Sequence, residues 1–149
     1  MTQSSAQVSP PVTKTLYTAK VHPVGGRDKG QARSSDGHLD IKLSVPGGPG
    51  TGTNPEQLFA AGYAACFLSA IRAAAAEQNT TIADDANVTA TVALGTRETG
   101  PGLALQVALG IDLPGVDRRT AERLVAVAQD NCPYTYATRG NVDVRVRIA

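Results

Sequence analysis

The chain has 149 residues, of which 42% are hydrophobic and 4% aromatic, and its 14 Lys and Arg nearly balance 13 Asp and Glu. This length suits one domain that can bury a substantial core. A balanced charge and few aromatic rings supply neither a basic surface nor a stacking platform. We therefore expect neither a nucleic-acid partner nor a membrane-surface partner.

The N-terminal residues 1–12 are polar, with three serines followed by Pro10 and Pro11. They lack the basic and apolar regions of a secretory signal peptide. We expect a flexible tail over 1–12, a single domain over 13–149 and a cytoplasmic location. Persistent disulfides are uncommon in that compartment, where those that form are mostly transient and catalytic.

Four segments alternate apolar and polar residues with the period of a half-buried strand. They are 38–45, 88–94, 103–113 and 142–148, and residues 16–21 form a weaker strand pattern before a turn at Gly25 and Gly26. Because only one face of each segment is apolar, the pattern predicts antiparallel sheets with one solvated face.

Two helices are predicted between these strands. The first has Asn54 as its N-cap and Pro55 in its first turn, and it runs to about Glu77. The second starts near Asp117 and ends at about Asn131, because Pro133 disfavours helical geometry in Cys132. The predicted order is βββ-α-ββ-α-β, which is an α+β domain.

The first helix is apolar on every side between Leu58 and Ala76. It is rich in alanine and carries Arg72, so a buried helix fits better than a membrane span. A helix that is apolar all round must be covered all round, and one sheet covers only one side. We expect a second copy of the chain to cover the other side, giving a homodimer.

The chain has two cysteines, Cys66 inside this helix and Cys132 at the end of the second helix. They could be a structural staple, inert core residues or a redox pair. A reactive Cys66 must be ionised, but an apolar site raises the pKa of a thiol. One nearby arginine would lower the pKa enough to ionise most of it. Cys132, at a helix C-terminus, suits a second nucleophile better than a first.

Three segments carry a resemblance to a known family. They are GTNPEQLFAAGYAACF over 52–67, CPYTYATRGN over 132–141 and GGRD over 25–28. Together they resemble the organic hydroperoxide resistance proteins, the hydroperoxidase branch of the OsmC-like group. The chain departs from the family pattern where Thr135 and Tyr136 replace Ser-Asn and where Lys29 is inserted after Asp28.

The resemblance implies an OsmC-like fold with antiparallel sheets around central helices in an intertwined homodimer. It implies a thiol peroxidase that reduces organic hydroperoxides to alcohols and serves in oxidative stress defence. Cys66 matches the peroxidatic cysteine and Cys132 the resolving cysteine, which together form a redox-active disulfide. Arg27 matches the catalytic arginine, and Glu56 matches the glutamate that holds it. Dihydrolipoyl groups on a partner protein are the implied reductant.

Helix geometry adds a constraint on this site. Glu56 and Cys66 are separated by ten residues, which is about 15 Å along a straight helix. Their side chains therefore cannot meet within one helix. We expect Arg27 and Glu56 to reach Cys66 from the partner subunit.

No cofactor or metal is expected, since His22 and His38 lack metal-ligand spacing with the cysteines. Two alternatives to an organic hydroperoxide peroxidase stay open at this point. One is an osmotically inducible peroxidase of the OsmC type, and the other is a non-enzymatic carrier of apolar ligands.

Overall fold

A computed structural model describes residues 12–149, so the predicted tail lies outside the described residues apart from Val12. The described chain forms two compact units, one ending at Gly52 and one spanning Thr53–Ala149. Each unit is described by itself. A single domain over 13–149 stays a prediction.

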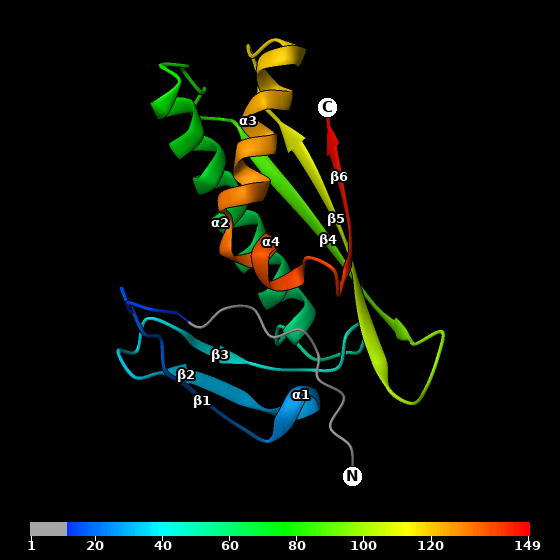
Figure 1. Ribbon diagram of the computed structural model, residues 1–149. Helices are drawn as coiled ribbons and strands as arrows, with labels where there is room; N and C mark the ends of the chain where they lie inside the picture. The colour runs from blue at the N-terminus through cyan, green and yellow to red at the C-terminus, as the bar shows by residue number, and fades with distance from the viewer. Residues whose placement is uncertain (1–11) are drawn as a thin grey trace. The chain divides into compact units, whose positions relative to one another are not determined.

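The first unit is a three-stranded antiparallel sheet in the order β1-β2-β3 (Figure 1). Its strands are β1 (Val21–Val24), β2 (Gln31–Ser34) and β3 (Asp40–Lys42), and the one-turn helix α1 (Gly26–Lys29) joins β1 to β2. Gly25 and Gly26 enter this turn with left-handed φ angles of 77° and 71°. Side chains disfavour that conformation, so the two glycines permit the tight connection.

The weak strand predicted over 16–21 is wrong in its boundaries. The strand begins at Val21, opposite Ser34, and β2 ends there. The backbone hydrogen bond from Ser35 N to Lys20 O closes the ladder, and residues 15–20 are not part of a strand. The strand predicted over 38–45 is present as the shorter β3.

The second unit contains the two predicted helices and the sheet β4-β5-β6. Its helices are α2 (Pro55–Glu77), α3 (Arg118–Asn131) and α4 (Pro133–Thr138), and its strands are β4 (Asn87–Thr96), β5 (Leu103–Asp112) and β6 (Asp143–Ile148). The predicted helix starts are confirmed. Asn54 Oδ1 accepts a hydrogen bond from Gln57 N at 2.9 Å, and Asp117 Oδ1 accepts one from Thr120 N at 3.0 Å.

The prediction of purely antiparallel sheets is wrong for β6. β4 and β5 are antiparallel, but β6 runs parallel to β5 with Val144 beside Val107. Parallel neighbours need a long crossover connection, and α3 and α4 supply it. The order βββ-α-ββ-α-β is confirmed for the main elements, with α1 and α4 as additional short helices.

Helices α2 and α3 cover one face of this sheet (Figure 1). The predicted apolar stripe of α3 is confirmed, because Ala121, Leu124, Val125 and Ala128 are all buried. Among residues 12–149, the largest fully buried side chains lie in this unit and are Tyr63, Phe67, Ile71, Leu109, Ile111, Leu124, Val107 and Cys132.

Helix α2 buries only one of its apolar faces within a single chain. Tyr63, Phe67 and Ile71 are fully buried against the core. The opposite stripe is exposed and consists of Leu58, Ala61, Ala65, Ser69 and Ala73. By length and composition α2 could also cross a membrane, with a mean hydropathy of 1.5. Its packing against β4 and α3 instead makes it a core helix of this fold.

Candidate functional site

The two thiols lie next to each other in the second unit. Cys66 lies in α2 and is partly exposed, whereas Cys132 has no exposed surface. Their side chains are close enough for Cys132 to raise the pKa of the Cys66 thiol. The structure thus brings together two sulfur atoms that are 66 positions apart in the sequence. The Cys66 side chain is partly exposed to solvent, and the Cys132 side chain is fully buried.

Cys132 occupies the junction between two helices. It follows the last residue of α3 and precedes Pro133, the first residue of α4, with an extended backbone at φ −71° and ψ 121°. The predicted end of α3 is confirmed. The new helix after it was missed, although proline suits the first position of a helix as well as it ends one.

The surroundings of Cys66 raise the pKa of its thiol. Burial is the largest cause, and the hydrogen bond to Cys132 and the negative charge that Cys132 carries when ionised act in the same direction. The backbone N–H of Tyr134 opposes them by donating a hydrogen bond to the Cys66 sulfur. The sequence-based expectation that an apolar site raises this pKa is confirmed.

A hydroxyl cluster fastens α4 to α2. The buried Tyr63 hydroxyl is 3.0 Å from Thr135 Oγ1 and 3.2 Å from Thr138 Oγ1. Thr138 Oγ1 also donates to the backbone oxygen of Tyr134 at 3.0 Å. Because these partly buried groups are satisfied by each other, they hold α4 in place beside the thiols.

Tyr134 packs against the same face of α2. Its ring centroid lies 6.0 Å from that of Phe59 and 5.5 Å from that of Tyr63. Tyr136 is 48% exposed. Of the two tyrosines that follow Cys132, Tyr134 therefore belongs to the site and Tyr136 lies at the surface.

The other two predicted site residues are Glu56 and Arg27. Glu56 is in the first turn of α2 and is half-buried. Because α2 is continuous from Pro55 to Glu77, Glu56 and Cys66 are separated along one helix, as the spacing argument requires. Arg27 is half-buried in α1 and belongs to the first unit. The roles of both residues stay predictions.

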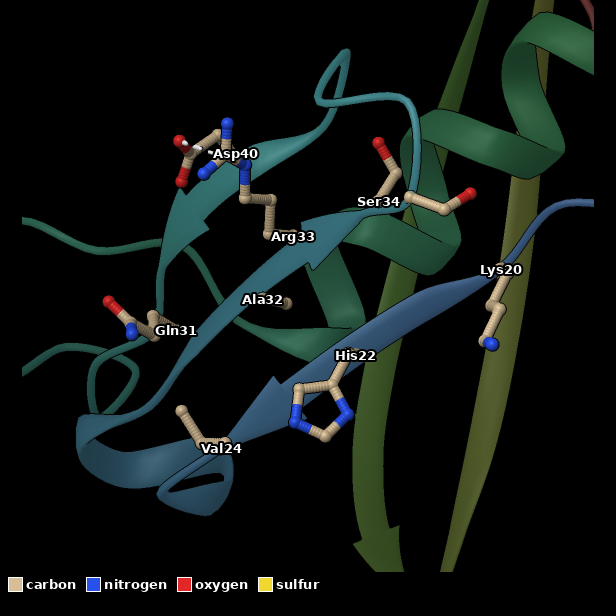
Figure 2. Close-up of a pocket in the computed structure, with 9 residues that line it drawn as sticks. Lys20, His22, Val24, Gln31, Ala32, Arg33, Ser34 and Asp40 are labelled. Carbon is tan, nitrogen blue, oxygen red and sulfur yellow. Dashed lines mark ion pairs between the residues drawn. The ribbon is translucent and has the colours of Figure 1, made fainter.

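A hollow of about 510 Å³ lies on the polar face of the first sheet and contains neither cysteine. Figure 2 shows His22 from β1, Arg33 from β2 and Asp40 from β3 beside it. Arg33 and Asp40 form an exposed ion pair at 3.9 Å. Since no cysteine lines it, this hollow offers no alternative centre for thiol chemistry. Within residues 12–149, no three His, Cys, Asp or Glu side chains cluster as metal ligands.

The chain is similar to known proteins over most of its length. The family model described as OsmC-like protein matches residues 48–147. The organic hydroperoxide resistance protein of Xanthomonas axonopodis pv. citri is 46% identical over 140 residues, which cover 91% of this chain and 96% of that protein.

Two solved structures have the same fold. The crystal structure of the organic hydroperoxide resistance protein OhrB of Bacillus subtilis matches with a TM-score of 0.84 at 45% identity, covering 91% of this chain and all of the other. That of an organic hydroperoxide resistance protein from Elizabethkingia anophelis matches with a TM-score of 0.83 at 39% identity, covering 92% and 99% of the two chains.

Proposed function

The chain belongs to the OsmC-like family, among the organic hydroperoxide resistance proteins, and from this premise we propose that it is a cysteine-based peroxidase that reduces organic hydroperoxides to alcohols. The observation that carries the proposal is the pairing of a partly exposed Cys66 with a fully buried Cys132. One thiol is accessible to a substrate, and the other is placed to react only with the first.

The proposed cycle begins at Cys66. Its thiolate attacks the terminal oxygen of the hydroperoxide, the O–O bond breaks, and the departing alkoxide takes up a proton to become the alcohol. Cys66 is left as a sulfenic acid. The Cys132 sulfur then attacks the Cys66 sulfur, a disulfide forms and water leaves.

A dithiol returns the protein to its starting state. One thiolate of the dithiol attacks the protein disulfide and forms a mixed disulfide with one cysteine, releasing the other. The second thiolate then attacks that mixed disulfide and releases the remaining cysteine. The external dithiol becomes a disulfide and both cysteines become thiols again. A dihydrolipoyl group on a partner protein is the proposed reductant, in keeping with the family resemblance, and the cytoplasm is the proposed location.

The first step needs a positive charge near Cys66, because burial and Cys132 both raise the pKa of its thiol. We assign that charge to Arg27, held by Glu56. Since Glu56 and Cys66 are separated along one continuous helix, the proposed site takes Arg27 and Glu56 from the partner subunit of a homodimer.

Peroxide consumption tests the function. The reduced protein is mixed with tert-butyl hydroperoxide and dihydrolipoamide, and loss of peroxide is followed. We expect turnover by the native protein and none by Cys66→Ser with its fold intact. Fatty-acid hydroperoxides should react at least as fast as tert-butyl hydroperoxide, and hydrogen peroxide more slowly.

Thiol counting in denaturant tests the second step. After one equivalent of hydroperoxide the native chain should have no free thiol, and Cys132→Ser should stop at a sulfenic acid on Cys66. Two remaining thiols would exclude the disulfide step. A protein that consumes no peroxide would be a carrier, and a preference for hydrogen peroxide would favour an osmotically inducible type.

A further inference from the structure

Gly62 lies in the middle of α2, one turn before Cys66. Its φ is not in the left-handed region, so its backbone does not require glycine. Glycine weakens a helix relative to alanine. A Cβ at this position would overlap the hydroxyl oxygen of Tyr134 and lie 3.0 Å from its Cζ atom. Gly62 therefore provides the space that the Tyr134 ring occupies.

The Tyr134 ring cannot leave that space without breaking other contacts. It also packs on Phe59 and Tyr63 at centroid distances of 6.0 and 5.5 Å. Positions 59, 62, 63 and 66 share one face of a helix, because they are spaced by three or four residues. The ring thus lies along the face of α2 that carries Cys66.

The backbone of Tyr134 is attached to the same face. Its N–H donates a hydrogen bond to the Cys66 sulfur, and Cys132 precedes it by two residues in the chain. Ring and N–H therefore tie the start of α4 to α2 at two points about one turn apart. A shift of the ring must move the segment that carries Cys132.

We propose that Gly62 and Tyr134 are positioning residues, and that the ring of Tyr134, seated on Gly62, holds Cys132 where it can close on Cys66. This inference rests on the proposed function and concerns its second step. A disulfide needs Cβ atoms about 3.5–4.5 Å apart. A methyl group at position 62 would push the ring back by about 1 Å, which is as large as that whole range.

The test compares the two steps in Gly62→Ala. After mixing with tert-butyl hydroperoxide at a pH at which Cys66 is ionised in both proteins, we expect oxidation of Cys66 to keep its rate within about twofold, since Cys66 itself is not displaced. Disulfide closure should slow by about 10- to 100-fold. A sulfenic acid that dimedone traps should accumulate. Unchanged closure would overturn the proposal.

A second oxidant separates this inference from the proposed function. Diamide takes two electrons and two protons from the thiol pair, becoming a hydrazine while the disulfide forms. Closure by diamide should also slow in Gly62→Ala, whether or not the protein reduces hydroperoxides. If the native chain forms the disulfide with diamide but not with hydroperoxide, the proposed function is wrong. If diamide closes the disulfide in Gly62→Ala as fast as in the native chain, the positioning contact is wrong.

Rescue and control variants identify the contact. Adding Tyr134→Phe to Gly62→Ala removes the overlapping oxygen and should restore most of the closure rate. Gly95→Ala places a methyl in β4 where nothing lies within 4 Å, and it should close like the native chain. A double variant no faster than Gly62→Ala would overturn the proposal.

A pH profile adds a readout that a merely structural role would not move. In a Cys132→Ser background, Gly62→Ala should shift alkylation of Cys66 to higher pH, because the Tyr134 N–H is drawn away from the sulfur. If Gly62→Ala fails to fold, Tyr134→Leu tests the contact between position 134 and Gly62 without adding volume to the core. Tyr134→Leu should also slow disulfide closure. A closure rate in Tyr134→Leu equal to that of the native chain would contradict the proposal.

Discussion

Cys66 and Cys132 show how two identical side chains are given different chemistry by their surroundings. Cys66 is partly exposed, and its pKa is raised by burial and by Cys132. The effect of burial was predictable from the apolar residues around Cys66. The N–H of Tyr134 that opposes it was not, because that group is positioned by α4, a helix too short to leave a periodic pattern.

Removing the positive charge of Arg27 tests the proposed ionisation of Cys66. Without that cation the thiolate loses its stabilisation, so the pKa of Cys66 should rise and the ionised fraction at pH 7 should fall. Arg27→Gln should move the alkylation profile of Cys66 to higher pH and lower the hydroperoxide rate at pH 7 by about 20-fold.

Arg33→Gln is the matched control for Arg27→Gln. Arg33 lies in the same unit, in an exposed ion pair with Asp40, and its loss should leave both measurements unchanged. Arg27→Lys keeps the charge and should lose less activity than Arg27→Gln. An alkylation profile that is identical in Arg27→Gln and the native protein would rule out this role of Arg27.

At the level of elements, caps and periodicity predicted the long pieces and failed for the short ones. Asn54 and Asp117 cap α2 and α3 as expected, because cap chemistry is local. The direction of β6 was not predictable, since an edge strand alternates in the same way whether its neighbour is parallel or antiparallel. The short helix α4 is attached to α2 by the hydroxyl cluster around Tyr63, and such a tertiary contact leaves no local sequence pattern.

Tyr63→Phe tests how much that cluster contributes. It removes one hydroxyl and leaves the ring in place, so Thr135 and Thr138 lose a buried partner. The free energy of unfolding should fall by about 1–2 kcal/mol in urea denaturation. Tyr136→Phe, at a 48% exposed side chain, should change it by less than about 0.5 kcal/mol. Equal effects of the two variants would show that the cluster does not stabilise the fold.

At the scale of the whole molecule, the sequence predicts that α2 is covered on every side by its own chain and a second copy. The exposed stripe of α2 is the part of that prediction that a single chain does not test. The helix is apolar on every side, but a single chain covers only the face with Tyr63, Phe67 and Ile71. The sequence pattern indicates that both faces of α2 are apolar, but it does not indicate which face packs against the sheet of the same chain. The proposed homodimer would cover the second face.

Ala73→Glu tests this assembly. Ala73 lies on the exposed stripe, nearly two turns beyond Cys66, and a carboxylate buried there without a partner is strongly unfavourable. Light scattering after size exclusion should give a dimer for the native chain and a monomer for Ala73→Glu. Ala108→Glu, on the outward face of β5, should remain dimeric. A native chain that elutes as a monomer would contradict the assembly.

The complete burial of Cys132 affects any experiment that counts the thiols of this protein with a bulky maleimide or a disulfide-based dye. The folded, reduced chain should take up one label, and a second should appear only after the chain is unfolded. A stoichiometry of one label per folded chain then reflects the burial of Cys132 and not the oxidation of either cysteine.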